Sequence, residues 1–259
     1  MASHGSLPAE LTIQIFCDLD SLSDALALSS TSRSFRNVWL EHANKIYLKL
    51  APRCIEGEKY ARALQLSGKS KFSAQDASRI CRRAEFTSSI ANQFEQKVVK
   101  GLYAVGWREI YGGPDGRHPE HLTPTERRRF FRTYYQLWSL LRLSDADWAS
   151  AVKAFSVKEV YLMREMVWIP LPIGKDQPLP EVQEHFPDFV WYESDGRRGE
   201  LGSLLQECVK KHVRNTGRGV EYPWADMQTD LRPNGGYGGF RLLWDHASNV
   251  LDDWCLEEP

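Results

Sequence analysis

The stretch that decides the fold of the first part of the chain is LPAELTIQIFCDLDSLSDALALSSTSRSFRNVW, residues 7–39. Its apolar side chains recur every three or four residues, which is the spacing of amphipathic helices. Leu7-Pro8 followed by Glu10 is typical of a helix start, because proline is tolerated in the first turn. The apolar stripe predicted for this first helix consists of Leu11, Ile15, Phe16 and Leu19.

Two further helices are predicted to follow. Ser21 and Asp24 can cap a short second helix, whose apolar side consists of Leu22, Ala25, Leu26 and Leu28. A third helix starts near Ser32 and is expected to end at Pro52, because proline cannot continue the hydrogen-bond ladder. A module of about 50 residues is marginal alone, and its apolar positions exceed what three helices can cover mutually. The surplus must face the rest of this chain or another protein.

The composition is that of a folded protein. With 259 residues, the chain can form one large domain or a small module plus a larger one. Hydrophobic residues make up 42 %, which excludes a disordered composition. The 33 Lys and Arg residues balance the 34 Asp and Glu residues, so net charge gives no argument for nucleic acid or an anionic membrane as a partner.

Cysteine usage and the lack of targeting signals suggest a reducing compartment. The five cysteines are scattered, and none forms a C-x-x-C pair, so a secreted disulfide framework is not expected. The first residues show no basic segment followed by an apolar one, as a signal peptide would have. No apolar run approaches the roughly 20 residues that span a bilayer. We expect a cytoplasmic or nuclear protein.

The remainder, residues 53–259, is predicted to be an irregular helical domain with little strand. Its clearest helix begins at Thr123, where Pro124 and Glu126 complete a capping box. An irregular segment rich in proline and aromatic residues covers 170–192, and long loops of this kind either carry function or wrap the core. The other helices are expected at 73–99, 144–155, 156–168, 199–215 and 240–256.

One ordered series of residues resembles a known motif. The series is Leu7-Pro8-x-Glu10-Leu11, Ile15-Phe16-x-x-Leu19, Asp24, Leu26-x-Leu28-Ser29, Ser32-Arg33-x-Phe35-Arg36 and Trp39. Residues 6–50 thereby resemble an F-box, the trihelical motif by which substrate receptors dock on the Skp adaptor of Skp–cullin–F-box ubiquitin ligases. The version with TSRSFR after the second helix is similar to F-boxes abundant in filamentous fungi.

The resemblance implies a helix-in-groove contact with the Skp adaptor, and through it with a cullin. It also implies that residues 53–259 recruit a protein substrate. Phe35, Val38 and Trp39 either hold the three helices together or add to the interface. The adaptor-contact residues it implies are Leu7, Pro8, Leu11, Ile15, Leu19, Leu26 and Leu28. In the competing interpretation, all of these residues are core positions that pack against residues 50–259.

No catalytic, metal or cofactor site is predicted. His118 and His121 are spaced like metal ligands, but no third ligand follows nearby. The glycine-rich segment 234–239 lacks a phosphate-loop pattern. Cys255 and His246 lie more than two helical turns apart, so they cannot form a nucleophile pair on one helix. Short arginine clusters such as 127–129 are expected to be solvated helix faces.

Three functions remain open on this basis. The first is a substrate receptor that performs no bond chemistry itself. Exposed aromatic side chains make good anchors, so the substrate is expected at Trp168, Phe189, Trp191 and Tyr192. The second is an interaction protein that binds the adaptor outside a ligase. The third is a helical enzyme or small-molecule binder whose N-terminal helices belong to its own core; an exposed apolar stripe within residues 7–28 would argue against it.

Overall fold

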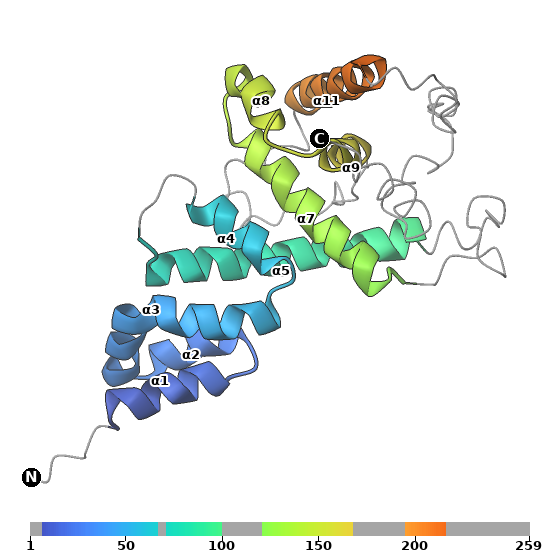
Figure 1. Ribbon diagram of the computed structural model, residues 1–259. Helices are drawn as coiled ribbons and strands as arrows, with labels where there is room; N and C mark the ends of the chain where they lie inside the picture. Colours follow the sequence, from blue (N-terminus) through green and yellow to red (C-terminus); the bar gives the residue numbers. More distant parts are fainter. Residues whose placement is uncertain (1–6, 67–70, 100–120, 168–194, 216–259) are drawn as a thin grey trace, which may run out of the picture. The chain divides into compact units, whose positions relative to one another are not determined.

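The computed structural model describes residues 7–66, 71–99, 121–167 and 195–215 (Figure 1). Over these ranges it contains nine α-helices, one π-helical turn and no strand, so the predicted mainly α fold is confirmed. Contacts divide the chain into two compact units, Met1–Ser89 and Ile90–Pro259. This division falls later than the domain boundary at residues 50–53 that the sequence suggested.

The first unit begins with three helices. Helices α1 (Ala9–Asp18) and α2 (Leu22–Thr31) both pack on α3 (Arg33–Cys54). The cap predicted for α2 is present, since Ser21 Oγ accepts a hydrogen bond from the Asp24 backbone N–H at 3.0 Å. Ser32 Oγ caps α3 in the same way through the Phe35 N–H. These caps fix the short turns between the helices.

Helix α3 differs from the prediction at its end. Pro52 was expected to stop it, but the helix continues to Cys54. A proline removes one backbone donor, and in the last turn this loss leaves the remaining ladder intact, as the Ile55 N–H to Ala51 carbonyl bond shows. The backbone is also non-helical at His42, with φ −114° and ψ 15°, a break that neither a proline nor a glycine explains.

Helix α4 (Glu58–Leu66) and helix α5 (Ala74–Phe94) follow. The sequence analysis assigned no element to the α4 segment, whereas α5 agrees with the helix expected from residue 73. The two helices are joined by buried polar side chains: Gln65 donates to Asp76 Oδ1 at 2.6 Å and accepts from Arg83 at 2.7 Å. Such a network is stable only because each charged group has a partner.

The second unit is built on α7 (Pro124–Leu141), with α8 (Asp145–Val152), α9 (Val157–Val167) and α11 (Asp195–Asn215) packed around it. These helices agree with the predicted ones, although α11 begins earlier than residue 199. Helix α7 supplies five buried rings to this unit. They are Phe130, Phe131, Tyr134, Tyr135 and Trp138, each at most 1 % exposed.

Other expectations fall outside the described residues. They concern the irregular segment 170–192, the glycine-rich segment 234–239 and the helix at 240–256. A short π-helical turn, η1 (Glu95–Val99), continues directly from α5. Among the described residues, no helix combines the length and the apolar character needed to cross a membrane.

Candidate protein-binding surface

Helix α1 has two apolar faces, and the chain buries only one of them. On the inner face, Ile13 and Phe16 are 8 % and 0 % exposed. On the outer face, Leu7 just before the helix, Leu11 and Ile15 are 51 %, 49 % and 39 % exposed. Residues four apart align along one side of a helix, so these three form a row, named here the outer stripe. Large contiguous patches of exposed apolar side chains mark partner sites, and the outer stripe is a candidate for the centre of such a patch.

The inner face is held by an aromatic cluster. The Phe16 ring lies edge-on to Phe35, with centroids 6.0 Å apart, and 5.8 Å from the Trp39 ring. Ring pairs at these distances add to the burial energy of the side chains. Phe35 and Trp39 therefore hold α1 on α3, which is one of the two roles that the sequence left open. Val38 is half-buried.

The end of α1 is bonded to α3, whereas its first turn is closed by hydrogen bonds within the helix itself. At its start, the Pro8 carbonyl accepts hydrogen bonds from the Thr12 N–H at 3.1 Å and the Thr12 hydroxyl at 3.2 Å. At its end, the Arg53 guanidinium of α3 donates to the carbonyls of Cys17 and Leu19. A cation at a helix C-terminus also complements the helix dipole. The outer stripe is thus presented by a helix that is anchored on the opposite side.

The other predicted contact residues lie beside this stripe in the sequence and keep accessible surface. Pro8 is exposed, whereas Leu19, Leu26 and Leu28 are half-exposed. The inner side of α2 is formed instead by Leu22 and Ala25, which are 2 % and 0 % exposed. None of the seven predicted contact residues is buried in the structure.

One part of the predicted stripe is wrong. Phe16 was grouped with Leu11 and Ile15, but it is buried on the inner face with Thr12, Ile13 and Cys17. At 100° per residue, Phe16 lies about 140° from Leu11 around the helix. A helical wheel would have revealed this separation, and it would also have pointed to Ile13 and Cys17 as inner residues that the sequence analysis missed.

The predicted substrate-binding residues, Trp168, Phe189, Trp191 and Tyr192, lie outside the described residues. The structure therefore places the predicted adaptor contacts but not the predicted substrate contacts.

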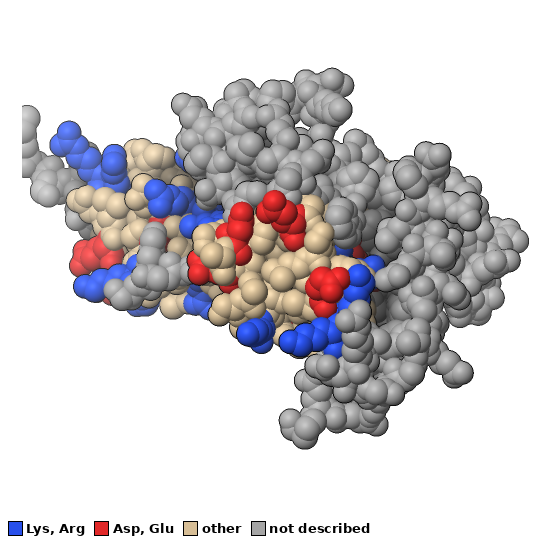
Figure 2. All heavy atoms as spheres, turned by 90° about the horizontal axis from the view of Figure 1, so that it is seen from above, with Lys and Arg blue, Asp and Glu red and all other residues tan. Residues whose placement is uncertain are grey.

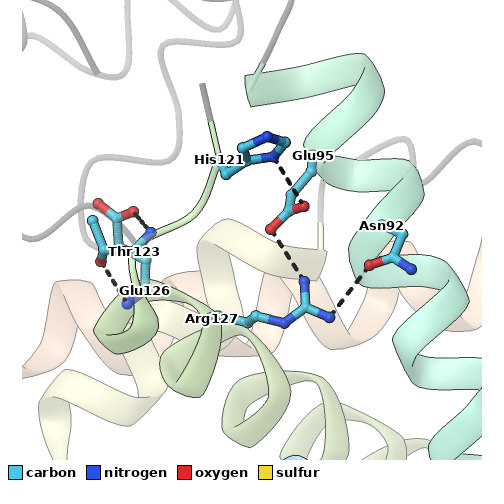
Figure 3. Close-up of polar contacts among 6 residues, drawn as sticks. All are labelled: Asn92, Glu95, His121, Thr123, Glu126 and Arg127. Atoms are coloured by element: carbon cyan, nitrogen blue, oxygen red, sulfur yellow. Dashed lines mark hydrogen bonds and ion pairs between the residues drawn. The ribbon is translucent and has the colours of Figure 1, made fainter. Parts of the chain in front are cut away.

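The second unit contains a polar cluster around Glu95, which is 9 % exposed (Figure 3). Glu95 Oε1 accepts a hydrogen bond from Arg127 Nη1 at 3.1 Å, and Glu95 Oε2 lies 3.6 Å from His121 Nδ1. Arg127 also donates to Asn92 Oδ1 at 3.3 Å. The cluster links the start of α7 to the end of α5 and to η1. A carboxylate already held by a guanidinium is a structural tie rather than a free acid or base.

The same view shows the capping box that begins α7 (Figure 3). Thr123 Oγ1 accepts from the Glu126 N–H at 3.2 Å, and Glu126 Oε2 accepts from the Thr123 N–H at 2.8 Å. The predicted capping box is confirmed. His121 lies two residues before it, and within the described part of the chain no three His, Cys, Asp or Glu side chains gather as metal ligands.

Three of the four described thiols have a raised pKa. Burial, together with the nearby Glu85 carboxylate, raises the pKa of Cys81 to about 12. Its Sγ lies 3.4 Å from Glu85 Oε1, which Ser23 Oγ also reaches at 2.9 Å. Burial likewise raises the pKa of Cys54 and of Cys208. A thiol that stays protonated at neutral pH does not attack a substrate, so these side chains serve packing.

Charge does not mark a second surface on the face drawn in Figure 2. Acidic and basic side chains of the described residues both occur there, and neither sign covers the face. A mixed surface of this kind is typical of a solvated helical protein. It offers no extended basic patch of the sort that binds a phosphate backbone.

Comparisons with protein-family models, curated proteins and solved structures gave no match. The likeness to an F-box therefore depends on the residues quoted above. The observation that the structure adds to it is the outer stripe on α1.

Proposed function

We propose that the first three helices dock on the Skp adaptor of a Skp–cullin–F-box ubiquitin ligase, and that the rest of the chain recruits a protein substrate. In this role the chain aligns a target with other subunits and breaks no bond itself. The outer stripe would enter an apolar groove of the adaptor in the manner of an amphipathic helix.

The observation that carries the proposal is the exposure of Leu7, Leu11 and Ile15 while the opposite side of α1 is sealed on α3. An isolated exposed leucine needs no explanation, but an aligned row of three large apolar side chains does. The third function considered above made the N-terminal helices part of the chain's own core. The exposed row is the feature expected to argue against it.

The outer stripe alone is too small for a firm complex. Complete burial of a leucine or isoleucine contributes about 1.5–3 kcal/mol, and a half-exposed side chain has roughly half of that left to gain. Three such side chains then supply roughly 3–4 kcal/mol, whereas a micromolar complex needs about 8 kcal/mol. The half-exposed Leu19, Leu26 and Leu28 must therefore share the interface, in agreement with the contact set implied by the resemblance.

The test is a binding measurement between the full chain and a purified Skp adaptor, by biolayer interferometry. The variant is the double substitution Leu11→Asp, Ile15→Asp, which places two charges on the outer stripe. We expect the wild type to bind and the variant to lose at least about 100-fold in affinity, since burying unpaired carboxylates in an apolar groove is costly. Absence of binding by a folded wild type would contradict the proposal.

The chain offers matched controls for both folding and position. Leu40 and Leu48 are as exposed as the outer stripe, at 57 % and 46 %, but lie on α3. Leu40→Asp, Leu48→Asp should therefore leave adaptor binding within about twofold, in line with surface substitutions elsewhere. Ile13 lies on the buried face, so Ile13→Asp should unfold the three helices. Its circular dichroism spectrum gives the reference for an unfolded variant.

Adaptor binding inside and outside a ligase can be told apart by adding a cullin. If the chain is a substrate receptor, size-exclusion chromatography of chain, adaptor and cullin should give one ternary complex. Formation of the binary complex alone, with the cullin eluting separately, would favour an interaction protein that uses the adaptor in another assembly.

A further inference from the structure

Charges are separated between the helices of the first unit. Residues 1–32 contain no lysine or arginine, and their four acidic residues are Glu10, Asp18, Asp20 and Asp24. Helix α3 has the opposite balance, with Glu41 as its single acidic residue. Its five basic residues are Arg33, Arg36, Lys45, Lys49 and Arg53. The apolar surface on α1 therefore belongs to a wholly acidic segment of the chain.

Two of these carboxylates belong to α1, the helix that presents the outer stripe, and two follow it in the chain. At 100° per residue, Asp18 lies about 20° from Leu11 and about 60° from Ile15, on the outer face, whereas Glu10 lies about 100° from Leu11, at the edge between the outer and the buried face. Both carboxylates are exposed, as are Asp20 after the helix and Asp24 in the first turn of α2. These four residues are named here the acidic rim. An apolar centre with a charged rim is the usual anatomy of a protein interface.

Asp18 occupies an unfavourable position for the stability of α1. It is the last residue of the helix, where the dipole favours cations and disfavours a carboxylate. Arg53 compensates by donating to the carbonyls of Cys17 and Leu19, and no ion pair of Asp18 is seen among the described residues. Sites that break a local stability rule are often functional sites, and a charge at the end of an exposed apolar row can serve a partner.

We infer that the partner groove that receives the outer stripe is rimmed by lysine and arginine side chains, which pair with the acidic rim. The inference rests on the proposed function, because the occupant is taken to be the Skp adaptor. Rim charges of this kind steer association and set its salt dependence more than they hold the finished complex together.

The experiment measures the rate constants for association and dissociation of the full chain with a purified Skp adaptor at about 0.03 to 0.5 M salt, over which screening lengths shorten severalfold. The variant is Glu10→Lys, Asp18→Lys. At low salt we expect its association rate constant to fall about tenfold, with little change in dissociation, and the difference to shrink at high salt. The melting temperature should change little, because Asp18→Lys suits the helix dipole whereas Glu10→Lys, in the first turn, opposes it.

Glu200→Lys, Glu207→Lys is the control matched in charge, since both residues are exposed and lie on α11 in the second unit. It should change association by less than about twofold. Adaptor binding that is insensitive to salt and to the rim variant would overturn the inference and leave the proposed function standing. Failure of the folded wild type to bind at any salt concentration would instead overturn the proposed function and the inference with it.

A second copy of this chain could also bind the outer stripe and the acidic rim through its own α3. That helix exposes Leu40 and Leu48 among basic residues. Sedimentation velocity of the chain alone tests this. Dimers that dissociate in high salt and are lost in Leu48→Asp would show that the acidic rim serves self-association, and would overturn the assignment to the adaptor. A monomer at all salt concentrations supports it.

Discussion

Helices α1 and α7 share an apolar periodicity but differ in how much of it the chain buries. In α7 the side chains Phe130, Tyr134 and Trp138 are at most 1 % exposed. In α1 the inner Phe16 is fully buried, while Leu11 on the other side is 49 % exposed. Helix α7 buries its apolar side chains within its own unit, whereas α1 leaves one of its two apolar faces exposed.

Ring contacts explain the difference. Along α7, Phe130 stacks on Tyr134 at 6.1 Å and receives Phe94 from the end of α5 at 5.1 Å. Tyr135 stacks on Trp138 at 6.5 Å, so neighbouring helices and neighbouring rings cover the apolar side chains of α7. No such partners reach the outer stripe among the described residues. An apolar pattern predicts that a helix has a buried face, and only the surroundings decide how many faces are buried.

The largest expected effect comes from truncating the buried rings. Trp138→Ala in α7 and Phe16→Ala in α1 should each lower the free energy of unfolding by about 3–5 kcal/mol, because a cavity remains where a large ring was packed. Leu11→Ala, on the outer stripe, should change it by less than about 0.5 kcal/mol. Urea denaturation followed by circular dichroism measures all three.

The pair on α1 is internally controlled, since Phe16 and Leu11 belong to one helix and differ in burial. Equal destabilisation by Phe16→Ala and Leu11→Ala would mean that the outer stripe is part of a core. The contrast between α1 and α7 would then disappear, and with it the structural support for a docking surface.

The two helices also begin differently, which allows a smaller test. Helix α7 has a complete capping box at Thr123, whereas α1 begins after Pro8 without a side-chain cap. Thr123→Ala should cost about 1 kcal/mol, because it leaves the Glu126 N–H without its acceptor. Ser203→Ala, at an exposed position within α11, removes a hydroxyl without a capping role and should be nearly neutral. If Thr123→Ala and Ser203→Ala lowered the free energy of unfolding equally, the loss of the cap would not be the cause.

Much of the fold was predictable because its signals are local. Capping pairs such as Ser21 with Asp24, and Thr123 with Glu126, are visible as letters three residues apart, and both form in the structure. The short helix α4 was missed although it is amphipathic, because its nine residues show the pattern over little more than two turns. The end of α3 was predicted two residues too early, because the effect of Pro52 on the hydrogen-bond ladder depends on how close it lies to the helix end.

The candidate site was predictable only in part, for a different reason. The sequence shows that Leu11 and Phe16 are both apolar, and a helical wheel separates them by angle. Phe35 and Trp39 decide which of these two side chains packs against α3. They lie 19 or more positions further along the chain than Phe16 and contact it only after folding. Whether a partner covers Leu11 is a property of another molecule and remains a prediction.

The smallest expected effect concerns the polar link between α7 and α9. Glu159 Oε1 accepts a hydrogen bond from Gln136 at 2.6 Å, and Oε2 accepts from the Ser156 N–H at 2.9 Å. Burial by itself would raise the pKa of Glu159, but the bonds from Ser156 and Gln136 outweigh it and hold the pKa below its usual value of 4.5. The folded state therefore favours the ionised carboxylate.

This shift makes part of the stability depend on pH. A carboxyl group whose folded pKa lies below the unfolded one contributes fully above the unfolded pKa, and the contribution is lost as pH falls through the folded pKa. Glu159→Gln should therefore destabilise the protein at pH 7, and its difference from the wild type should shrink below about pH 4.5. Urea denaturation at pH 7, 5 and 3.5 measures this difference in the free energy of unfolding.

In a Gln136→Ala background, Glu159→Gln should destabilise the protein less, because the two side chains share one hydrogen bond. A difference that is constant with pH would show that Glu159 contributes through packing alone, and that the link between α7 and α9 is no more electrostatic than the contact between α1 and α3.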